Sequence, residues 1–439
     1  MSQTPSRPVV YLHIGTPKSG TTYLQGILWH NRQALREEGL QYTGREHGAH
    51  LRASFDLQER DVQDGWRDPA IAGAWKQAVE EAREWPRRTL ISHETFALAE
   101  PEHADRALAD LDFAEVHLII TMRDLARQIP AAWQEEVKNR NPVTYQTYLS
   151  RLREDPAPDR PRHPFWVFQD VPGILERWAR DVPPERVHIV TVPPPGSPPT
   201  VVWERFSRVL GIDPARYDTT RTFGNPSLGM AQAQLLRKFN ELLLARPEEE
   251  RPSWPDYLRI FKDVYAQQIL VELPGDRRIT LPKDCHDWVV ERAETMISEL
   301  RDGGYDIVGD LEDLRPALPA DPAPAAAPVG DDALLETALR SVEALIRRME
   351  REREQARRRL ERAREEARAE ADGLRARIAE LEEVLGKPAV KLFVRRLSEQ
   401  YPPVMRARVA YWHAVESGRR VWGGPNRPRR RDERPGDRS

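Results

Sequence analysis

The segment with the clearest chemical content is Gly15-Thr16-Pro17-Lys18-Ser19-Gly20-Thr21-Thr22-Tyr23-Leu24, which lies between a short apolar run and an amphipathic stretch. A glycine-containing turn between a strand and the N-terminus of a helix directs several backbone N–H groups toward one point. The helix dipole adds positive potential there, so such a turn binds an anion, usually phosphate. The segment therefore predicts a phosphate-type binding loop.

The position of the lysine distinguishes this loop from that of the common nucleoside-triphosphate enzymes. In their loop, two glycines enclose four residues, and a lysine and a serine or threonine follow the second glycine. Gly15 and Gly20 have this spacing, but Thr21 follows Gly20, and Lys18 comes two residues before it. Lys18 can still reach an anion held by the loop, yet it lacks the place that spans the β- and γ-phosphates. The pattern argues against an ordinary ATPase or kinase.

This displaced lysine resembles the 5′-phosphosulfate loop of the sulfotransferase family, in which the run is Pro-Lys-Ser/Thr-Gly-Thr-Thr-Tyr/Trp-Leu. Residues 17–24 match the run at every position, and the resemblance covers roughly residues 8–310. It implies a P-loop-like sulfotransferase of the bacterial type that uses 3′-phosphoadenosine 5′-phosphosulfate (PAPS). Lys18 would neutralise charge on the leaving oxygen. The residues that the resemblance implies for donor binding in the loop are Pro17, Lys18, Ser19, Gly20, Thr21 and Thr22.

A second segment begins at Arg123, after the apolar run VHLIIT, and matches the family in part. The resemblance implies that Arg123 holds the 3′-phosphate of the nucleotide, together with a serine eight residues later. Ala131 stands at that serine position. The loss of one hydrogen bond to a charged oxygen costs about 1.5–3 kcal/mol, or about tenfold or more in affinity. Arg127 or Gln128 could compensate. The alternative role of Arg123 is a strand-end arginine paired with Asp124.

Two titratable residues, His93 and Glu94, follow the short apolar run TLIS. In an open parallel sheet, ligands bind beyond the carboxyl ends of the strands. We therefore expect this pair, the loop after Gly15 and Arg123 to meet in one crevice. Many sulfotransferases have Glu or His here as the general base that takes the proton of the acceptor hydroxyl. The resemblance implies Glu94 as the catalytic base, with His93 as the second candidate. In a purely structural alternative, Glu94 caps the following helix.

Two weaker features concern the donor and metals. Arg277 and Arg278 lie where family members often add a basic contact to the 3′-phosphate. Arg277 is therefore a further candidate for donor binding, although a solvated turn explains the pair equally well. His47 and His50 lack a third residue at metal-ligand spacing. Sulfuryl transfer to a hydroxyl needs no metal, because lysine and backbone amides can neutralise the leaving group, and we expect none.

The elements that must position these residues follow from hydrophobic periodicity. Short apolar runs rich in Val and Ile are typical of buried parallel strands, and they occupy residues 9–14, 89–92, 116–121 and 187–192. Helical patterns occupy residues 22–38, 73–84, 126–138 and 200–210. This alternation predicts a doubly wound α/β fold with a parallel sheet. The predicted sulfotransferase domain spans residues 1–315.

A linker and a long helix are predicted next. Residues 316–330 form a Pro/Ala-rich linker, and residues 331–386 form a coiled coil with one break in its heptad phase. Its two apolar seams start at Leu335 and Leu339 and recur every seven residues. The alternative is a single solvated helix held by Glu–Arg pairs. Because apolar residues fill both seams at each end, we expect the coiled coil and with it a homodimer.

Residues 387–439 form a basic, partly amphipathic tail. They carry 14 Lys or Arg against 5 Asp or Glu, although the whole chain of 439 residues has a formal net charge of −3. With the aromatic residues Phe393, Tyr401, Tyr411 and Trp412, such a tail could contact an anionic membrane surface. A helical cap followed by a disordered end is the alternative. We expect no nucleic-acid partner.

Composition excludes several classes of protein. The single cysteine, Cys285, excludes a disulfide scaffold and any multi-cysteine metal site. No stretch reaches the roughly 18 apolar residues of a membrane span, and the first residues lack the apolar core of a signal peptide. We therefore expect a cytoplasmic protein.

Together these features predict a PAPS-dependent sulfotransferase. It would move a sulfuryl group to a hydroxyl, or as second choice an amine, of a carbohydrate, lipid or small-metabolite acceptor. The sequence does not choose among these acceptors. Two other classes stay open. One is a nucleotide-binding or scaffold protein that has the fold but no turnover, which Ala131 and the coiled coil would fit. The other is an atypical P-loop kinase, which would need magnesium and ATP.

Overall fold

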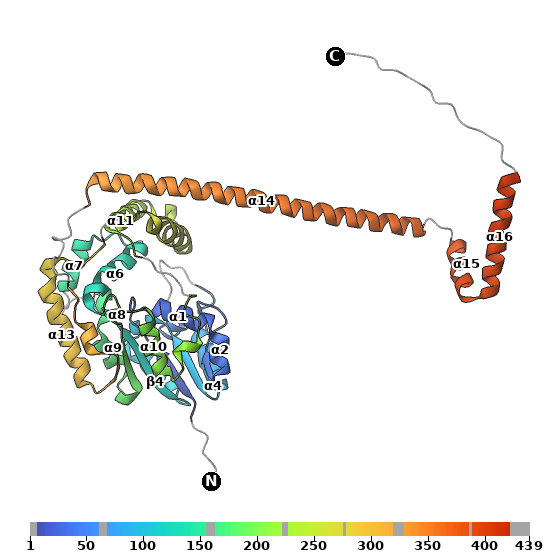
Figure 1. The fold of residues 1–439 in the computed structure, drawn as a ribbon. Coiled ribbons are helices and arrows are strands. Elements are labelled where there is room, and N and C mark those ends of the chain that lie inside the picture. The colour runs from blue at the N-terminus through green and yellow to red at the C-terminus, as the bar shows by residue number, and fades with distance from the viewer. Residues whose placement is uncertain are drawn as a thin grey trace, which may run out of the picture. The chain divides into compact units, whose positions relative to one another are not determined.

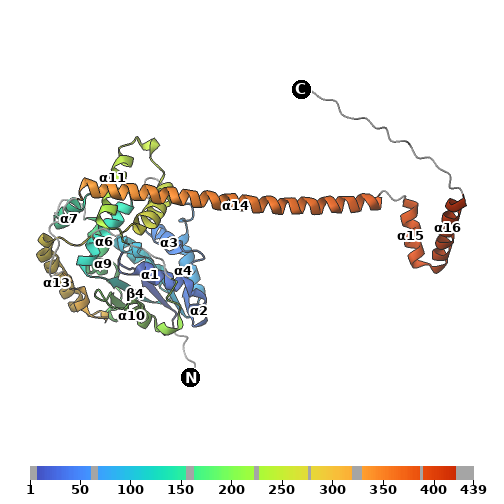
Figure 2. The same cartoon turned by 45° about the horizontal axis from the view of Figure 1, so that its top comes forward.

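The chain forms two compact units, Met1–Ile346 and Arg347–Ser439. A computed structural model describes residues 7–60, 68–154, 163–221, 227–274, 278–318, 329–385 and 389–421. The first unit contains a sheet with helices on both faces (Figures 1 and 2). The second contains the outer part of a long helix and two shorter helices.

The sheet has six strands, and every pairing between neighbours is parallel. Their order is β2-β3-β1-β4-β5-β6, so β1 lies between β3 and β4 and the loops that follow these three strands meet at one edge. This confirms the predicted α/β fold with a parallel sheet. The strands are β1 (Val9–His13), β2 (Leu40–Tyr42), β3 (Arg88–Ser92), β4 (Glu115–Met122), β5 (Val187–Thr191) and β6 (Asp306–Val308).

Alternate residues of each central strand pack on opposite faces of the sheet, as a parallel sheet covered on both sides requires. Leu12 and Leu118 belong to the larger core cluster, which α3, α4, α5, α6, α9 and α13 cover. Tyr11 and Ile119 belong to the smaller cluster, which α1, α2 and α10 cover. The four central strands were predicted from the sequence. The edge strands β2 and β6 were not, because each has only three residues.

The helices agree with the four predicted helical patterns, except that the first is divided at Asn31 into α1 and α2. The residues 258–269 form a π-helix, η5, and a short 3₁₀ turn, η1, follows β3. The helices are α1 (Thr21–His30), α2 (Arg32–Glu37), α3 (Ala49–Leu57), α4 (Ala74–Glu84), η1 (Glu94–Leu98), α5 (Pro101–Asp110), α6 (Leu125–Lys138), α7 (Tyr145–Arg153), α8 (Pro164–Gln169), α9 (Val171–Trp178), α10 (Thr200–Leu210), α11 (Met230–Leu244), α12 (Trp254–Tyr257), η5 (Leu258–Ile269), α13 (His286–Asp302), α14 (Asp331–Leu385), α15 (Ala389–Gln400) and α16 (Pro402–Val421).

The predicted long helix is present as α14, which is continuous over 55 residues. Within the first unit, its start packs on the sheet domain through Leu334, Ala338 and Leu345. Ser341 lies 3.0 Å from the hydroxyl of Tyr265. The large apolar seam residues of this part of α14 are exposed, among them Leu335, Leu339 and Ile346. Pairing of this seam in a coiled coil stays a prediction.

The described elements of the second unit are helices. Its part of α14 carries ion pairs spaced three or four residues apart, such as Arg358 with Glu354. Within α15 and α16, Phe393, Tyr411 and Trp412 are exposed, and contact with a membrane surface stays a prediction. Over the described residues, no helix is both long and apolar enough to cross a membrane.

Candidate active site

The loop after β1 has the backbone geometry of an anion site. Gly15 has a φ of 75° and Gly20 a φ of 89°, values that glycine adopts without strain. Lys18 between them has a φ of 65°. Helix α1 begins directly after Gly20 and has no acidic residue in its first turn. The first N–H groups of α1 have no partner within the helix, so they can bind an anion.

The loop is tied to the end of β4. The Thr16 N–H and hydroxyl both donate to the carbonyl of Thr121, at 3.0 and 3.1 Å. The Ser19 hydroxyl donates to the carbonyl of Thr16 at 2.5 Å and lies 2.6 Å from the Thr121 hydroxyl. Ser19 is fully buried and does not line the cavity described below. Its side chain therefore stabilises the loop, and a role of Ser19 in donor binding stays a prediction for its backbone.

Glycine at position 15 permits Glu94 to approach the loop. A Cβ atom on Gly15 would lie 2.9 Å from Cβ and 3.0 Å from Cα of Glu94, which is closer than carbon atoms normally approach. Any side chain there would push the turn after β3 away from the loop. The glycine therefore fixes the short separation between the anion loop and the candidate base.

The structure assigns different surroundings to His93 and Glu94. Nδ1 of His93 accepts a hydrogen bond from the Thr95 N–H at 3.2 Å, so His93, and not Glu94, caps η1. Glu94 lines the cavity and accepts a hydrogen bond from Gln25 at 3.2 Å. Burial alone would raise the pKa of Glu94, but His93 and the hydrogen bond from Gln25 hold it below its ordinary value. Glu94 is therefore an ionised carboxylate at neutral pH.

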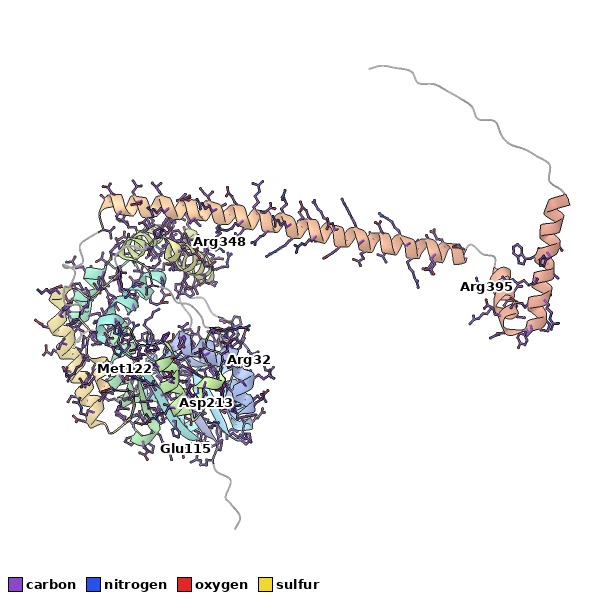
Figure 3. All side chains as sticks on the ribbon, in the orientation of Figure 1. Arg32, Glu115, Met122, Asp213, Arg348 and Arg395 are labelled. Atoms are coloured by element: carbon purple, nitrogen blue, oxygen red, sulfur yellow. The ribbon has the colours of Figure 1, made fainter. Side chains whose placement is uncertain are left out.

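Arg123 follows Met122, which together with Glu115 marks the ends of β4 in Figure 3. Its guanidinium donates to the Gln128 side chain and to the carbonyl of Arg127, both at 2.9 Å. It does not take Asp124 as its ion-pair partner, since Asp124 pairs with Arg127. Burial lowers the pKa of Arg123 to about 10, with Arg127 as a further cause. Arg123 thus stays charged at neutral pH and available to a ligand in the cavity.

The two residues that could compensate for Ala131 are engaged elsewhere. Arg127 pairs with Asp124. The Gln128 amide donates to the carbonyl of Pro17 and, at 2.8 Å, to Gln169. Ala131 lines the cavity, whereas neither Arg127 nor Gln128 does. The structure therefore shows no hydroxyl at the predicted serine position, and Gln128 instead connects Arg123 with the loop.

One cavity of about 1000 Å³ brings most of the predicted site residues together. This volume lies at the upper end of the roughly 300–1,000 Å³ typical of ligand sites. Ser19 and His93 are not in its lining. Arg277 lies outside the described residues. The predicted residues that line the cavity are Pro17, Lys18, Gly20, Thr21, Thr22, Glu94 and Arg123.

A cluster of charged residues in the same cavity was not predicted. Glu135 on α6 binds Lys18 Nζ at 2.5 Å with one oxygen and Lys262 Nζ at 2.7 Å with the other. Burial alone would raise the pKa of Glu135, but the two lysines hold it well below its ordinary value. Lys138 lies on the same face of α6, and burial lowers its pKa to about 8. Helical spacing from Ala131 could have indicated Glu135 and Lys138, whereas no sequence signal indicated Lys262.

Comparison with solved structures shows a distant likeness to a known fold. The chain is similar to a crystal structure of a sulfotransferase from Alicyclobacillus acidocaldarius, with 18% sequence identity and a TM-score of 0.33. The match covers 57% of this chain and 99% of that chain. No family model and no curated protein matches the chain. The function proposed below is therefore argued from the residues of the cavity.

Metal ligation finds no support in the part of the chain that the structure describes. Those residues contain no group of three or more His, Cys, Asp or Glu side chains that could hold a metal ion. His50 instead lies 2.7 Å from the Thr43 hydroxyl and accepts from the Ser92 N–H at 3.3 Å. The absence of a metal requirement stays a prediction.

Two buried histidines, His13 and His50, are expected to make the stability of the fold depend on pH. Burial lowers the pKa of His13 and of His50 to about 3, from an ordinary value of 6.5. Both are neutral when folded and become charged on unfolding, so the unfolded chain binds more protons below pH 6.5. We expect each to lower the free energy of unfolding by about 1.4 kcal/mol per pH unit as the pH falls from 6.5 toward 3.

Thermal unfolding midpoints between pH 7.5 and 4.5 would measure this effect. A His13→Gln variant should show a shallower decline than the wild type, whereas His286→Gln, at the start of α13, serves as a matched control. Equal slopes for the wild type and the His13→Gln variant would contradict the assignment.

Proposed function

We propose that the protein is a sulfotransferase that moves the sulfuryl group of PAPS to a hydroxyl, or less readily an amine, of an acceptor. The observation that carries this proposal is the common cavity of Lys18, Glu94 and Arg123. The donor has two anionic ends, a 5′-phosphosulfate and a 3′-phosphate. The cavity offers the loop and α1 to one end and Arg123 to the other, so the residues present fit the group.

In the proposed reaction, each residue has a separate task. Glu94 takes the proton of the acceptor hydroxyl as that oxygen bonds to sulfur. The bond from sulfur to the bridging oxygen breaks, and the phosphate keeps the electron pair. Lys18 and the N–H groups at the start of α1 stabilise the charge that develops on that oxygen. Such positioning and electrostatic stabilisation would supply most of the rate enhancement.

The geometry gives less support to the kinase alternative. Asp124, the acid after β4 that could bind magnesium, is 2% exposed, pairs with Arg127 and does not line the cavity. A protein with the fold but no turnover is the remaining alternative, and sulfuryl transfer to any acceptor would eliminate it.

Calorimetric titration with 3′-phosphoadenosine 5′-phosphate (PAP), the desulfated product, tests the proposal. We expect micromolar binding to the wild type. Arg123→Ala should weaken it by about tenfold or more, because a hydrogen-bonded charge contact is lost. Arg180→Ala, which removes an exposed ion pair with Asp105, is the matched control. No binding at millimolar PAP, or tighter binding of ATP, would contradict the proposal.

The exposed seam of α14 supports self-association as a second part of the proposal. Leu339 and Met349 are 62% and 67% exposed, and a second copy of the helix would bury them. In equilibrium sedimentation we expect twice the mass of one chain for the wild type and the mass of one chain for Ile346→Glu. Arg351→Glu, an even larger change of charge on the opposite face, should stay dimeric. A monomeric wild type would instead favour the single solvated helix.

A further inference from the structure

The described lining of the cavity contains no large aliphatic side chain. It contains the ring of Tyr23 and the small residues Pro17, Gly20 and Ala131, but among the described residues no Leu, Ile, Val, Met, Phe or Trp. Ligand sites are usually lined mainly by apolar and aromatic side chains. A lining of this kind therefore restricts the ligand that can bind beside the donor.

Four polar side chains in the lining are available to a ligand. The hydroxyls of Tyr23 and Ser227, the carboxylate of Asp263 and the amide of Gln267 form no hydrogen bond or ion pair with the described residues. They offer donors and acceptors together, which suits hydroxyl groups, since a hydroxyl can both donate and accept. Asp263 and Gln267 lie on the π-helix η5, four residues apart.

The charged residues that α6 and η5 contribute to the lining balance one another. Lys138 and Lys262 are opposed by Glu135 and Asp263, and Lys262 is already bound to Glu135 and to Asn139. Over the whole described lining, four cationic side chains face three acidic ones, and the phosphates of the donor would neutralise the remaining positive charge. The available groups therefore favour a neutral molecule with many hydroxyls.

From these observations we propose that the acceptor is a neutral polyhydroxylated compound of the carbohydrate class. This inference rests on the proposed function. We assign the loop and Arg123 to the donor, and Asp263 and Gln267, which are unpaired among the described residues, to the acceptor. One acceptor hydroxyl gives its proton to Glu94 and forms the new bond to sulfur, as in the proposed reaction. The other hydroxyls bond to Tyr23, Asp263 and Gln267.

A phenol or a lipid alcohol fits this lining poorly. Its apolar body would take water away from Asp263 and Gln267 without offering them hydrogen bonds, and a buried polar group without a partner is strongly unfavourable. A saccharide replaces the water with its own hydroxyls. This difference separates the carbohydrate class from the aromatic and lipid classes.

Transfer assays with radiolabelled PAPS and the full chain would test the acceptor class. The probes are a panel of neutral mono- and disaccharides, 4-nitrophenol and 1-dodecanol. We expect kcat/KM for the best saccharide to exceed that for either alcohol by at least tenfold. Faster transfer to 4-nitrophenol or dodecanol, or no transfer to any saccharide by protein that binds PAP, would overturn the inference. Failure to bind PAP would instead overturn the proposed function.

Variants of η5 provide the second measurement. Asp263→Ala and Gln267→Ala should each raise KM for the best saccharide by about tenfold and leave the Kd for PAP within twofold. Asp287→Ala, at an exposed acid of α13, is the matched control. Unchanged KM values in both variants would overturn the assignment, and an unchanged Kd for PAP would show that the variants are folded.

Discussion

Replacing Glu94 by glutamine is expected to lower kcat by about 10²- to 10⁴-fold, the contribution typical of a positioned general base. Glutamine keeps the size and the contact with Gln25 but cannot take a proton. The Kd for PAP should stay unchanged, because Glu94 is assigned to the acceptor side of the reaction. Single-turnover transfer and calorimetric titration on the same variant would measure the two effects.

Two controls separate this role from others. Glu100→Gln changes an exposed carboxylate before α5 and should leave turnover unchanged. His93→Gln should mainly lower stability, by about 1 kcal/mol, because the cap of η1 is lost. Unchanged turnover in Glu94→Gln with a large loss in His93→Gln would transfer the role of base to His93.

The pH dependence of kcat/KM tests whether the base is unprotonated at neutral pH. The pKa of Glu94 lies below its ordinary value, so Glu94 is deprotonated throughout the neutral range and produces no acid limb in kcat/KM above pH 5. The pKa of His93 is lowered from 6.5, chiefly by burial. A catalytic His93 would therefore also stay unprotonated near neutral pH, so the variants above, and not the pH profile, decide between the two residues. A flat profile between pH 5.5 and 7.5 is expected.

The second large effect is expected for Lys18→Met, which should lower kcat/KM by about 10²- to 10³-fold, the range for removal of one donor to a developing charge. Methionine keeps much of the volume and removes the ammonium group. The Kd for PAP should also rise. Steady-state kinetics and titration would show both effects. Lys76→Met, which changes an exposed side chain of α4, is the matched control.

The same variant tests the ion-pair cluster. Without Lys18, Glu135 has Lys262 as its remaining ion-pair partner in the described structure, and breaking a buried pair is destabilising. The thermal midpoint of Lys18→Met should fall, and Glu135→Gln added to it should lower the midpoint further, because Lys262 then loses its carboxylate partner. Full turnover in Lys18→Met would refute the assigned role.

The parts of the site that could be predicted are those that local sequence determines. The turn between β1 and α1 needs two glycines in left-handed conformation, and Gly15 and Gly20 stand at those positions. Glu94 and Arg123 could be predicted because each follows a strand of a parallel sheet, and such strand ends meet at one edge. The fold class followed from the same strands.

The parts that could not be predicted depend on tertiary packing. The inward direction of the Ser19 hydroxyl depends on the position of Thr121 on β4. Lys262 reaches Glu135 from a π-helix, whose i to i+5 hydrogen bonds give a period that apolar patterning does not reveal. The edge strands depend on pairing with longer neighbours, because three residues give no pattern of their own.

The carboxylate of Glu135 has a consequence for the selectivity of the site. Three lysines and an arginine gathered in one cavity would otherwise attract any small anion of the solution, chloride included. Glu135 is covalently attached, so its effective concentration at Lys18 is far above that of a free competitor. A weak monovalent anion cannot displace it, whereas a ligand with several charges and many contacts can. Lys18 is thereby available to a multivalent ligand and not to a small anion.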